Sequence, residues 1–381
     1  MNIEDKVTHG YKERFCSKSV DKIPRCLILF ENSCKSKRTF NDYTQFMNKF
    51  LAWVHKDHNS LLLIPTKELE ELLQDYCIFQ RKRSENNEIS PNSVPYFFNA
   101  IFKFLKVNRK KIDKESITQL YPDKVKLGGD LAISTEQCQL LLESTGEKRE
   151  KALVHVYSAT GARPEAICNL QLKHVVSYQN DFMKLVLYVG HSHEMITFIH
   201  PEAVEVLNEY LEWRKVRGEK LTSESYVFRA NTSWSNQKMS LSVMENVMAR
   251  FWKGSGIKRN KIGHNYDIAS IRGFRKRFDT ILEMNPEVSM GATQYLMDHA
   301  GYLSGKHYRR PTTEQLFESY KKATPDLMIN EKYRLELEIE QKEKQLRENE
   351  SQKDLRIKEL EQRAERTEKL LMKLMTKLDG S

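Results

Sequence analysis

The sequence predicts a mainly α-helical protein with a small β-sheet. We expect a helical domain, then an α+β domain, then a C-terminal coiled coil. Three observations predict this: apolar residues recur at helical spacing through 39–111, two short apolar strands lie within 184–199, and the chain beyond Lys332 is rich in Glu, Lys, Arg and Leu, without Gly or Pro until Gly380. With 381 residues, the chain is long enough for two or three domains.

The composition indicates a protein that binds a polyanion. The formal net charge is +10, most simply explained by a DNA partner. The first residues lack the apolar core of a signal peptide, and no apolar run approaches the roughly 20 residues that span a bilayer. Six cysteines are scattered without a CxxC pair, which predicts reduced thiols and no metal site. We therefore expect a cytoplasmic, nucleoid-associated protein without a membrane partner.

Residues 1–35 are interpreted as an N-terminal extension, and 36–127 as a helical domain that clamps DNA. Thr39 and Thr66 are expected to cap its first two helices, and a Ser/Pro signal precedes the third. The basic runs at 81–83 and 109–111 are either DNA contacts or solvated helix ends. The apolar positions expected to face the core are Phe40, Tyr43, Phe46, Phe50, Val54, Leu69, Leu72, Leu73, Tyr76, Phe97, Ile101, Phe104 and Leu105.

The α+β domain is expected over residues 131–325, after a linker that contains Gly128 and Gly129. Ser134 is expected to cap its first helix. The segments KLVLYVG and MITFI predict a β-hairpin whose turn carries His191 and His193.

The coiled-coil tail is predicted over residues 332–379. Apolar residues occupy eight of the twelve positions of an alternating 4,3 register, which is weakest in its middle. From Asp326 on there are 13 Lys/Arg and 14 Asp/Glu, so the basic excess lies in the preceding domains. The register positions are Ile339, Glu343, Leu346, Glu350, Lys353, Ile357, Leu360, Ala364, Thr367, Leu371, Leu374 and Leu378.

The stretch from Ser270 to Tyr308 carries the functional signal. Arg272 and Arg275 share one face of a predicted helix, His299 follows, and Tyr308 comes nine residues later. A phenol can attack a phosphodiester as a covalent nucleophile, while arginines hold the non-bridging oxygens where charge develops. These residue types predict Tyr attack on DNA.

A third arginine lies upstream, in SATGARPEAICNL, where Arg163 follows a Thr-Gly turn and opens a helix. There it can point at an anion beside free backbone N–H groups. Together with the stretch above, this pattern resembles the tyrosine recombinase (phage integrase) family over roughly residues 36–322. The segments FRKRF and HYRRPT look most like integrases of archaea and their viruses.

The resemblance implies that Tyr308 is the nucleophile, that Arg163 and Arg275 hold the phosphate, and that Arg272 and His299 support them. Arg272 stands where the family has a histidine, and Ala166 stands where it has an acidic residue.

The family's lysine on the β-hairpin is missing. His191 or His193 is the tentative general acid in its place, and Lys184 is a poorer candidate. His264 competes for the missing imidazole, and Tyr320 competes as nucleophile; its setting predicts helix packing.

The resemblance therefore implies a site-specific DNA recombinase or integrase of a mobile element that forms a 3′-phosphotyrosyl intermediate. It would act on double-stranded DNA as a homo-oligomer, a tetramer on two DNA sites, without a cofactor or metal. The alternative is a DNA-binding protein that keeps the fold but has impaired or lost catalysis. The tail should pair with another copy or fold back on the body.

Overall fold

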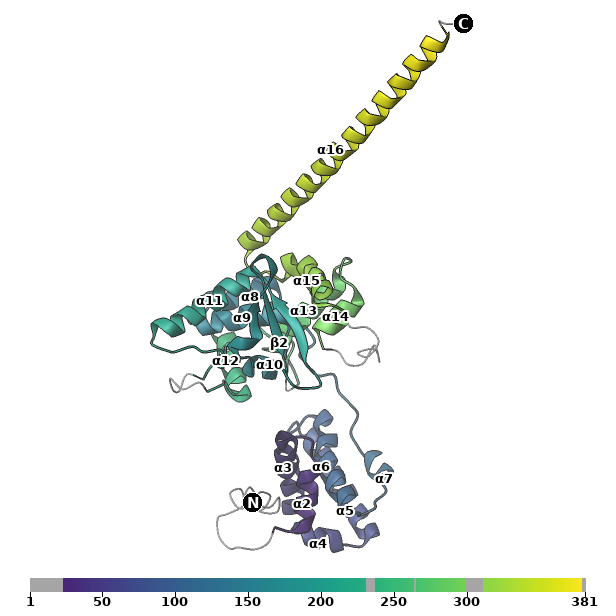
Figure 1. Ribbon diagram of the computed structural model, residues 1–381. Helices are drawn as coiled ribbons and strands as arrows, with labels where there is room; N and C mark the ends of the chain where they lie inside the picture. Colours follow the sequence, from purple (N-terminus) through teal and green to yellow (C-terminus); the bar gives the residue numbers. More distant parts are fainter. Residues whose placement is uncertain (1–22, 231–236, 264, 299–310, 379–381) are drawn as a thin grey trace, which may run out of the picture. The chain divides into compact units, whose positions relative to one another are not determined.

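The computed structural model describes residues 23–230, 237–263, 265–298 and 311–378. The chain forms two compact units, Met1–Leu127 and Gly128–Ser381. Figure 1 shows that unit 1 is helical, whereas unit 2 combines helices with a small sheet and continues into the long helix α16.

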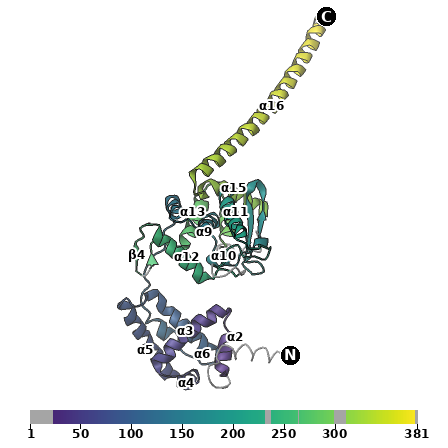
Figure 2. The same cartoon turned by 90° about the vertical axis from the view of Figure 1, so that its left-hand side faces the viewer.

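Unit 1 is a bundle in which α3, α5 and α6 lie side by side, as both Figure 1 and Figure 2 show. Its core is unusually aromatic: the ring centroids of Phe50 and Tyr76 lie 4.9 Å apart, and those of Phe46 and Phe97 lie 5.0 Å apart. The predicted apolar positions are buried or packed against this core, because helical periodicity places them on one face. The helices of unit 1 are α2 (Arg25–Asn32), α3 (Lys37–Val54), α4 (His58–Leu63), α5 (Thr66–Glu85), η1 (Pro91–Ser93), α6 (Val94–Val107) and α7 (Glu115–Thr118).

The N-caps predicted for α3 and α5 were wrong. Ser36 is the N-cap of α3, and its side chain accepts a hydrogen bond from the N–H of Thr39 at 3.1 Å. A capping side chain accepts from a residue two or three positions later, so Thr39 is the partner rather than the cap. At α5 the helix already includes Thr66, and Pro65 occupies the cap position.

Helix α2, which lies in the segment interpreted from the sequence as an N-terminal extension, packs against the core of unit 1. Cys26 and Phe30 are buried, and the Phe30 ring lies 5.5 Å from that of Phe104. A helix of eight residues has too few turns to show a clear apolar period, which is why the sequence did not reveal it.

The two basic runs of unit 1 contain residues with structural partners. Arg81 and Arg83 pair with Glu85 and Glu88, at 3.2 and 2.9 Å. Lys110 donates to the carbonyl oxygen of Leu62 at the end of α4. These contacts favour the helix-end interpretation for these three residues.

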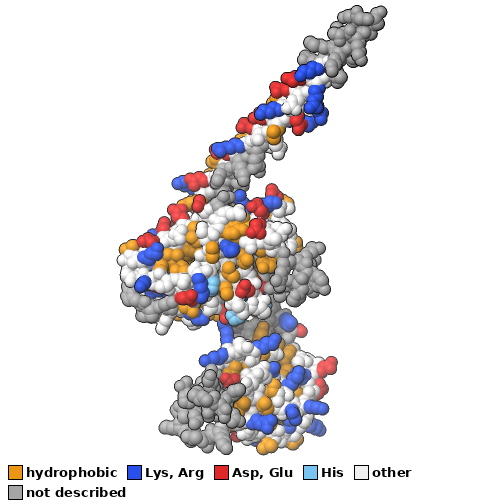
Figure 3. All heavy atoms as spheres, viewed as in Figure 1, with side chains coloured by type: hydrophobic (Ala, Val, Ile, Leu, Met, Phe, Trp, Pro, Cys, Tyr) orange, Lys and Arg blue, Asp and Glu red, His pale blue; other side chains and the backbone are white. Residues whose placement is uncertain are grey.

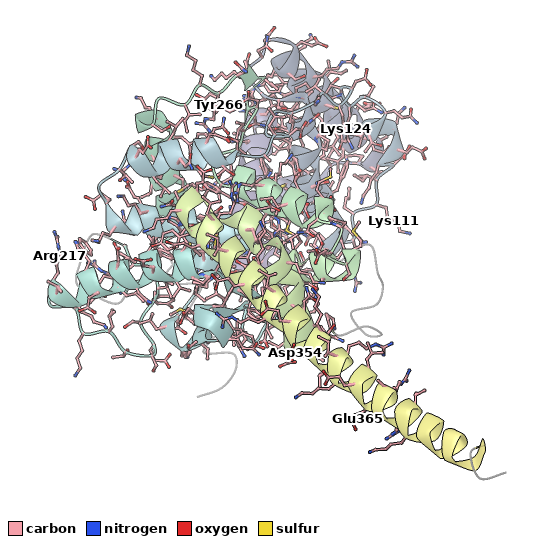
Figure 4. All side chains as sticks on the ribbon, turned by 90° about the horizontal axis from the view of Figure 1, so that it is seen from above. Lys111, Lys124, Arg217, Tyr266, Asp354 and Glu365 are labelled. Atoms are coloured by element: carbon pink, nitrogen blue, oxygen red, sulfur yellow. The ribbon has the colours of Figure 1, made fainter. Side chains whose placement is uncertain are left out.

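Lys111, next to Lys110, is exposed (Figure 4). Its charge therefore remains accessible at the surface of unit 1.

The sheet of unit 2 has three antiparallel strands in the order β1-β2-β3. β2 (Met183–Leu187) and β3 (Met195–Ile199) form the predicted hairpin, with Lys184 opposite Phe198 and Leu187 opposite Met195. β1 (Val175–Ser177) was not predicted, because three residues are too few to show an alternating pattern.

Helix α9 lies at the centre of unit 2 and packs against α11, α13 and β3, while α15 covers the same strand (Figure 1). Ser134 caps α8 in a capping box with Gln137, as its sequence predicted. The remaining elements of unit 2 are α8 (Thr135–Glu143), α9 (Lys148–Thr160), α10 (Pro164–Cys168), η2 (Leu172–His174), η3 (Gln179–Asp181), α11 (Pro201–Val216), α12 (Leu241–Gly254), β4 (Lys261–Ile262), β5 (Asn265–Tyr266), α13 (Arg272–Met284), α14 (Met290–Leu296), α15 (Thr313–Leu327) and α16 (Glu331–Leu378).

Two buried charged side chains hold the connection between α15 and α16. Arg277, on α13, donates to the carbonyl oxygen of Asp326 at 2.7 Å. Glu202, in the first turn of α11, accepts from the N–H groups of Ile329 at 3.0 Å and Asn330 at 2.9 Å. Helix ends expose carbonyl and N–H groups that need such partners. This connection is therefore a fixed part of unit 2.

Helix α16 runs unbroken from Glu331 to Leu378 (Figures 1 and 2). Asp354 and Glu365 project from it into solvent (Figure 4), and acidic and basic side chains alternate along it (Figure 3). Across the residues that the structure describes, no helix combines the length and the apolar character that crossing a membrane requires.

Candidate active site

A sharp turn between α9 and α10 presents Arg163. Gly161 ends α9 in the left-handed conformation, with a φ of 55°. A Cβ here would lie 2.8 Å from the side chain of Phe278, so the turn requires glycine. Arg163 is the N-cap of α10, which has only five residues and begins with Pro164. Proline has no N–H, so the guanidinium, rather than a helix N-terminus, supplies most of the positive charge here.

Arg275 comes from α13 and meets the same turn. Its Nη1 donates to the carbonyl oxygen of Gly161 at 2.9 Å, and its Nη2 donates to the carbonyl oxygen of Met297. Burial, followed by the nearby charge of Arg163, lowers the pKa of Arg275. Two cations held this close are stabilised by an anion placed between them.

A buried carboxylate, Asp298, lies at the centre of the cluster. Its Oδ2 accepts from Nη1 of Arg163 at 2.7 Å, and its backbone oxygen accepts from Nη2 of Arg163 at 3.3 Å. The same Oδ2 lies 3.4 Å from Nδ1 of His193. Asp298 has a φ of 48°, in the left-handed region that Asp tolerates better than most residues. Asp298 is not among the residues predicted from the sequence, because nothing in the local sequence singles it out.

The turn of the β2–β3 hairpin brings His193 to this carboxylate. The N–H of His191 donates to the carbonyl oxygen of Tyr188, and the N–H of Gly190 donates to Oε2 of Glu194, so the turn is internally bonded. Histidine side chains are visible at the surface of unit 2 in Figure 3. Of the two histidines proposed from the sequence, the described contacts bring His193 to the arginine cluster, while His191 is exposed on the same turn.

Tyr188 closes one side of the cluster. Burial raises the pKa of its phenol, while the charge of Arg163 and a hydrogen bond with it lower that pKa. Burial outweighs the arginine, so Tyr188 stays neutral and acts as a hydrogen-bond partner for the guanidinium.

Arg272 is placed at the first position of α13 and is exposed. Gly273, the next residue of α13, is closely approached by other parts of unit 2. Its carbonyl oxygen accepts from the N–H of Ile133, and a Cβ at Gly273 would lie 3.0 Å from Ile268. This glycine therefore serves the packing of α13.

The structure places Lys184 and Tyr320 away from the cluster. Lys184 lies within β2, whereas Tyr188 follows the end of that strand with a left-handed φ of 56°. Its Nζ lies 5.9 Å from the ring centroid of Tyr178. Tyr320 is buried, and its hydroxyl donates to the carbonyl oxygen of Ala159 at 2.9 Å. Such a phenol is a packing residue of α15, as its sequence context predicted.

Three residues of the sequence interpretation, His264, His299 and Tyr308, lie outside the described residues. The stretch that carries His299 and Tyr308 is bounded by two fixed points. Asp298 is held by Arg163 on one side, and Thr312 caps α15 with a capping box on the other.

The described cluster is suited to a phosphate group. Two guanidinium groups offer N–H donors in a fixed geometry that matches phosphate oxygens, and His193 adds a group that can donate or accept a proton. Within the described ranges, no group of three or more His, Cys, Asp or Glu side chains could hold a metal ion. The five cysteines that the structure describes are free.

Residues 132–315 match the model of the phage integrase family. This match covers just under half of the chain. The integrase segment begins just before α8 and ends in the first turn of α15, so it contains Arg163, Arg275, His193 and Asp298. No curated protein sequence matches the chain.

Solved structures of recombinases and integrases are similar to this chain at low sequence identity. The XerA recombinase is 21% identical, with a TM-score of 0.37, over 78% of this chain and 98% of that chain. The Tn1549 transposon integrase, in complex with transposon right end DNA, is 12% identical, with a TM-score of 0.50, over 78% of this chain and 99% of that chain. A λ integrase tetramer bound to a Holliday junction is 12% identical, with a TM-score of 0.49, over 81% of this chain and 89% of that chain.

Proposed function

We propose that this chain is a site-specific DNA recombinase that cuts and rejoins DNA through a 3′-phosphotyrosyl intermediate. Tyr308 attacks the scissile phosphate, and the 5′ oxygen leaves. Arg163 and Arg275 hold the non-bridging oxygens, while Arg272 and His299 support them. The reverse reaction, attack by a 5′ hydroxyl, rejoins the DNA without an external energy source.

The convergence of Arg163 and Arg275 is the observation that supports this proposal best. They come from elements more than 100 residues apart, yet Arg275 donates to Gly161, two residues before Arg163. Charge builds on the non-bridging oxygens as the phosphate becomes five-coordinate, and charge-assisted contacts to these oxygens lower the barrier most when they are preorganised. A fold that merely packed its helices would gain little from placing two arginines side by side.

The proposed recombinase function also implies the partner of unit 1. Unit 1 would grip double-stranded DNA as the helical clamp, with exposed cations such as Lys111 on phosphates, which makes affinity salt-dependent. The segments FRKRF and HYRRPT support an origin in an archaeal mobile element. The protein would work on DNA in the cytoplasm.

The tail would join protomers. The described apolar register positions Ile339, Leu346, Ile357 and Leu360 are exposed along α16, at 52–60% of full exposure, so the stripe is uncovered in the single chain. We expect the helix of a second copy to cover this stripe, because the charges beside it are complementary. In a parallel pair, Arg356 of one helix faces Glu361 of the other. Such pairing would help gather four protomers on two DNA sites.

Covalent capture tests the proposal. Randomly nicked, labelled duplex fragments that tile the DNA on either side of this chain's coding sequence serve as substrates. A denaturing gel then shows label that stays attached to protein. Tyr308→Phe should abolish capture but retain binding in a gel shift, since only the attacking oxygen is lost. Tyr320→Phe is the matched control and should retain capture.

If the wild-type chain binds these fragments but captures none, it is a DNA-binding protein with the integrase fold and no cleavage activity. Capture that survives in the Tyr308 variant and disappears in the Tyr320 variant would reverse the assignment of the nucleophile.

A further inference from the structure

We propose that Asp298 is a positioning residue that prepares His193 as the general acid for the leaving 5′ oxygen. This inference rests on the proposed recombinase function and assigns the proton donor within it. Its observation is geometric: one buried carboxylate oxygen serves both Arg163, at 2.7 Å, and His193, at 3.4 Å.

Burial makes Asp298 an anchor rather than a solvated surface charge. Its side chain is 2% exposed, whereas the side chains of Arg163 and His193 are 41% and 58% exposed. The carboxylate is therefore fixed, while the side chains of Arg163 and His193 reach from it toward the surface where DNA can approach. A carboxylate close to a phosphate would repel it if unpaired, so its contact with Arg163 is required for the site to bind an anion.

The contact through Nδ1 determines which nitrogen of His193 is free. With Nδ1–H directed at Asp298, the imidazolium presents Nε2–H on the opposite side of the ring. A partner on one ring nitrogen that orients the other is a common arrangement for catalytic and metal-binding histidines. His193 then stands beside Arg163 with a proton to give.

The chemical step needs that proton. As the bond from phosphorus to the attacking phenol oxygen forms and the bond from phosphorus to the 5′ oxygen breaks, the 5′ oxygen takes the proton from Nε2 of His193. The phenol proton leaves to solvent, and no electron is gained or lost. In rejoining, neutral His193 takes the proton of the 5′ hydroxyl, so the same residue serves both directions.

The other candidates do not reach this position. Lys184 lies within β2, and its Nζ is directed at Tyr178, 5.9 Å from the ring centroid. His191 is exposed on the turn and serves as a matched control, because it has the same side chain two residues away. The charged groups around His193 are Asp298, Arg163 across the same carboxylate, and Glu194 on its own turn.

A leaving-group substitution tests the inference. Duplexes are prepared with oxygen or sulfur at the 5′ bridging position of the scissile phosphate, mapped from the captured DNA described above. A thiolate leaves without a proton donor, so sulfur bypasses general acid catalysis. The variants are His193→Gln, Asp298→Asn, the control His191→Gln and the clamp variant Arg275→Lys. Asparagine tolerates the left-handed backbone of position 298 and keeps an oxygen for Arg163.

With the oxygen substrate, we expect His193→Gln and Asp298→Asn to lose about 10²–10⁴-fold in cleavage rate, the usual contribution of a general acid. With the sulfur substrate, both should return to within about tenfold of the wild-type chain, because no proton is needed. His191→Gln should match the wild-type chain on both substrates. Arg275→Lys should be slow on both, since phosphate contacts are needed whatever the leaving group.

Several outcomes would overturn the inference. A wild-type cleavage rate for Asp298→Asn with the oxygen substrate would show that Asp298 has no part in general acid catalysis. A loss in that variant that sulfur does not restore would reduce Asp298 to a partner of Arg163. Sulfur rescue of a defective His191→Gln would move the acid to the other histidine. Failure of the wild-type chain to form any covalent complex would overturn the recombinase function itself, which distinguishes the two failures.

Discussion

Replacing Gly161 with alanine tests whether the turn between α9 and α10 must be this tight. The left-handed φ of 55° costs an alanine roughly 1–2 kcal/mol. The new Cβ would also lie 2.8 Å from Phe278, which is fully buried and cannot move aside. Overpacking of this kind typically costs about 1–3 kcal/mol. The two terms together predict a loss of roughly 2–5 kcal/mol in the free energy of unfolding of unit 2.

The same change should disturb the phosphate clamp. The carbonyl oxygen of Gly161 accepts from Arg275, and Arg163 follows two residues later, so a shift of the turn moves both arginines. A displacement of about 1 Å in a catalytic group can cost on the order of 10²-fold in rate. We therefore expect covalent capture to fall by about that factor, even at a temperature where the variant remains folded.

Alanine variants of two other glycines separate the cost of the left-handed backbone from the cost of the steric clash. Gly218 has a φ of 88° but open space around its Cβ position, so its alanine variant should show only the backbone cost of roughly 1–2 kcal/mol. Gly146 has neither constraint, and its variant should stay within about 0.5 kcal/mol of wild type. Hydrogen exchange of the α9 amides measures the stability of unit 2 in each variant. If Gly161→Ala matches Gly146→Ala in both stability and capture, the reasoning about this turn is refuted.

Three further predictions concern the clamp, the buried histidines and the tail. Arg275→Lys should reduce capture by about 10²–10³-fold while DNA binding in a gel shift persists, because a point charge cannot replace the guanidinium fork. Burial lowers the pKa of His155 from its ordinary 6.5 to about 4. As pH falls through this window, the unfolded chain binds a proton that folded unit 2 excludes. This histidine should therefore cost unit 2 about 1.4 kcal/mol of stability per pH unit. Buried His200, whose pKa is also lowered by burial, contributes in both proteins, so the pH slope of the unfolding free energy should be smaller in His155→Gln by the share of His155. Truncation after residue 338 should lower the number of chains per particle, measured by light scattering at tens of micromolar, but leave capture on a single site unchanged.

Each of these has an outcome that contradicts it. Full capture by Arg275→Lys would mean that the guanidinium geometry is not needed. Burial raises the pKa of Glu202, which opposes the effect of His155 in both proteins, so the comparison is the difference between them. Equal acid slopes in wild type and His155→Gln would show that His155 titrates normally. Equal numbers of chains per particle with and without the tail, together with unchanged recombination, would rule out its assembly role.

Local patterns in the sequence were enough to predict α3, α5 and α6 of unit 1 and the β2–β3 hairpin. Leu69 and Leu73 are both buried because residues four apart share a helix face, and that relation is visible in the sequence. The turn before Arg163 was equally visible, since the Thr-Gly pair ends one helix and Pro164 begins the next.

Asp298 could not be predicted, because its role depends on contacts that span the fold. Arg163 lies 135 positions away in the sequence, and the contact to His193 depends on the register of the hairpin. The choice between His191 and His193 has the same origin: neighbouring residues of a turn point in different directions, and sequence spacing does not determine which one faces the site. α2 was missed for the opposite reason, since eight residues carry too little pattern.

The connection between α15 and α16 determines how the tail can be exchanged. The composition of the chain changes at Lys332, which suggests a tail that could be removed or replaced there. Glu202, however, holds the N–H groups of Ile329 and Asn330, and the hydroxyl of Tyr333 donates to Glu205. A cut before these residues would leave a buried carboxylate without its donors. A transplanted tail would therefore fold with this body only if the graft began beyond Tyr333.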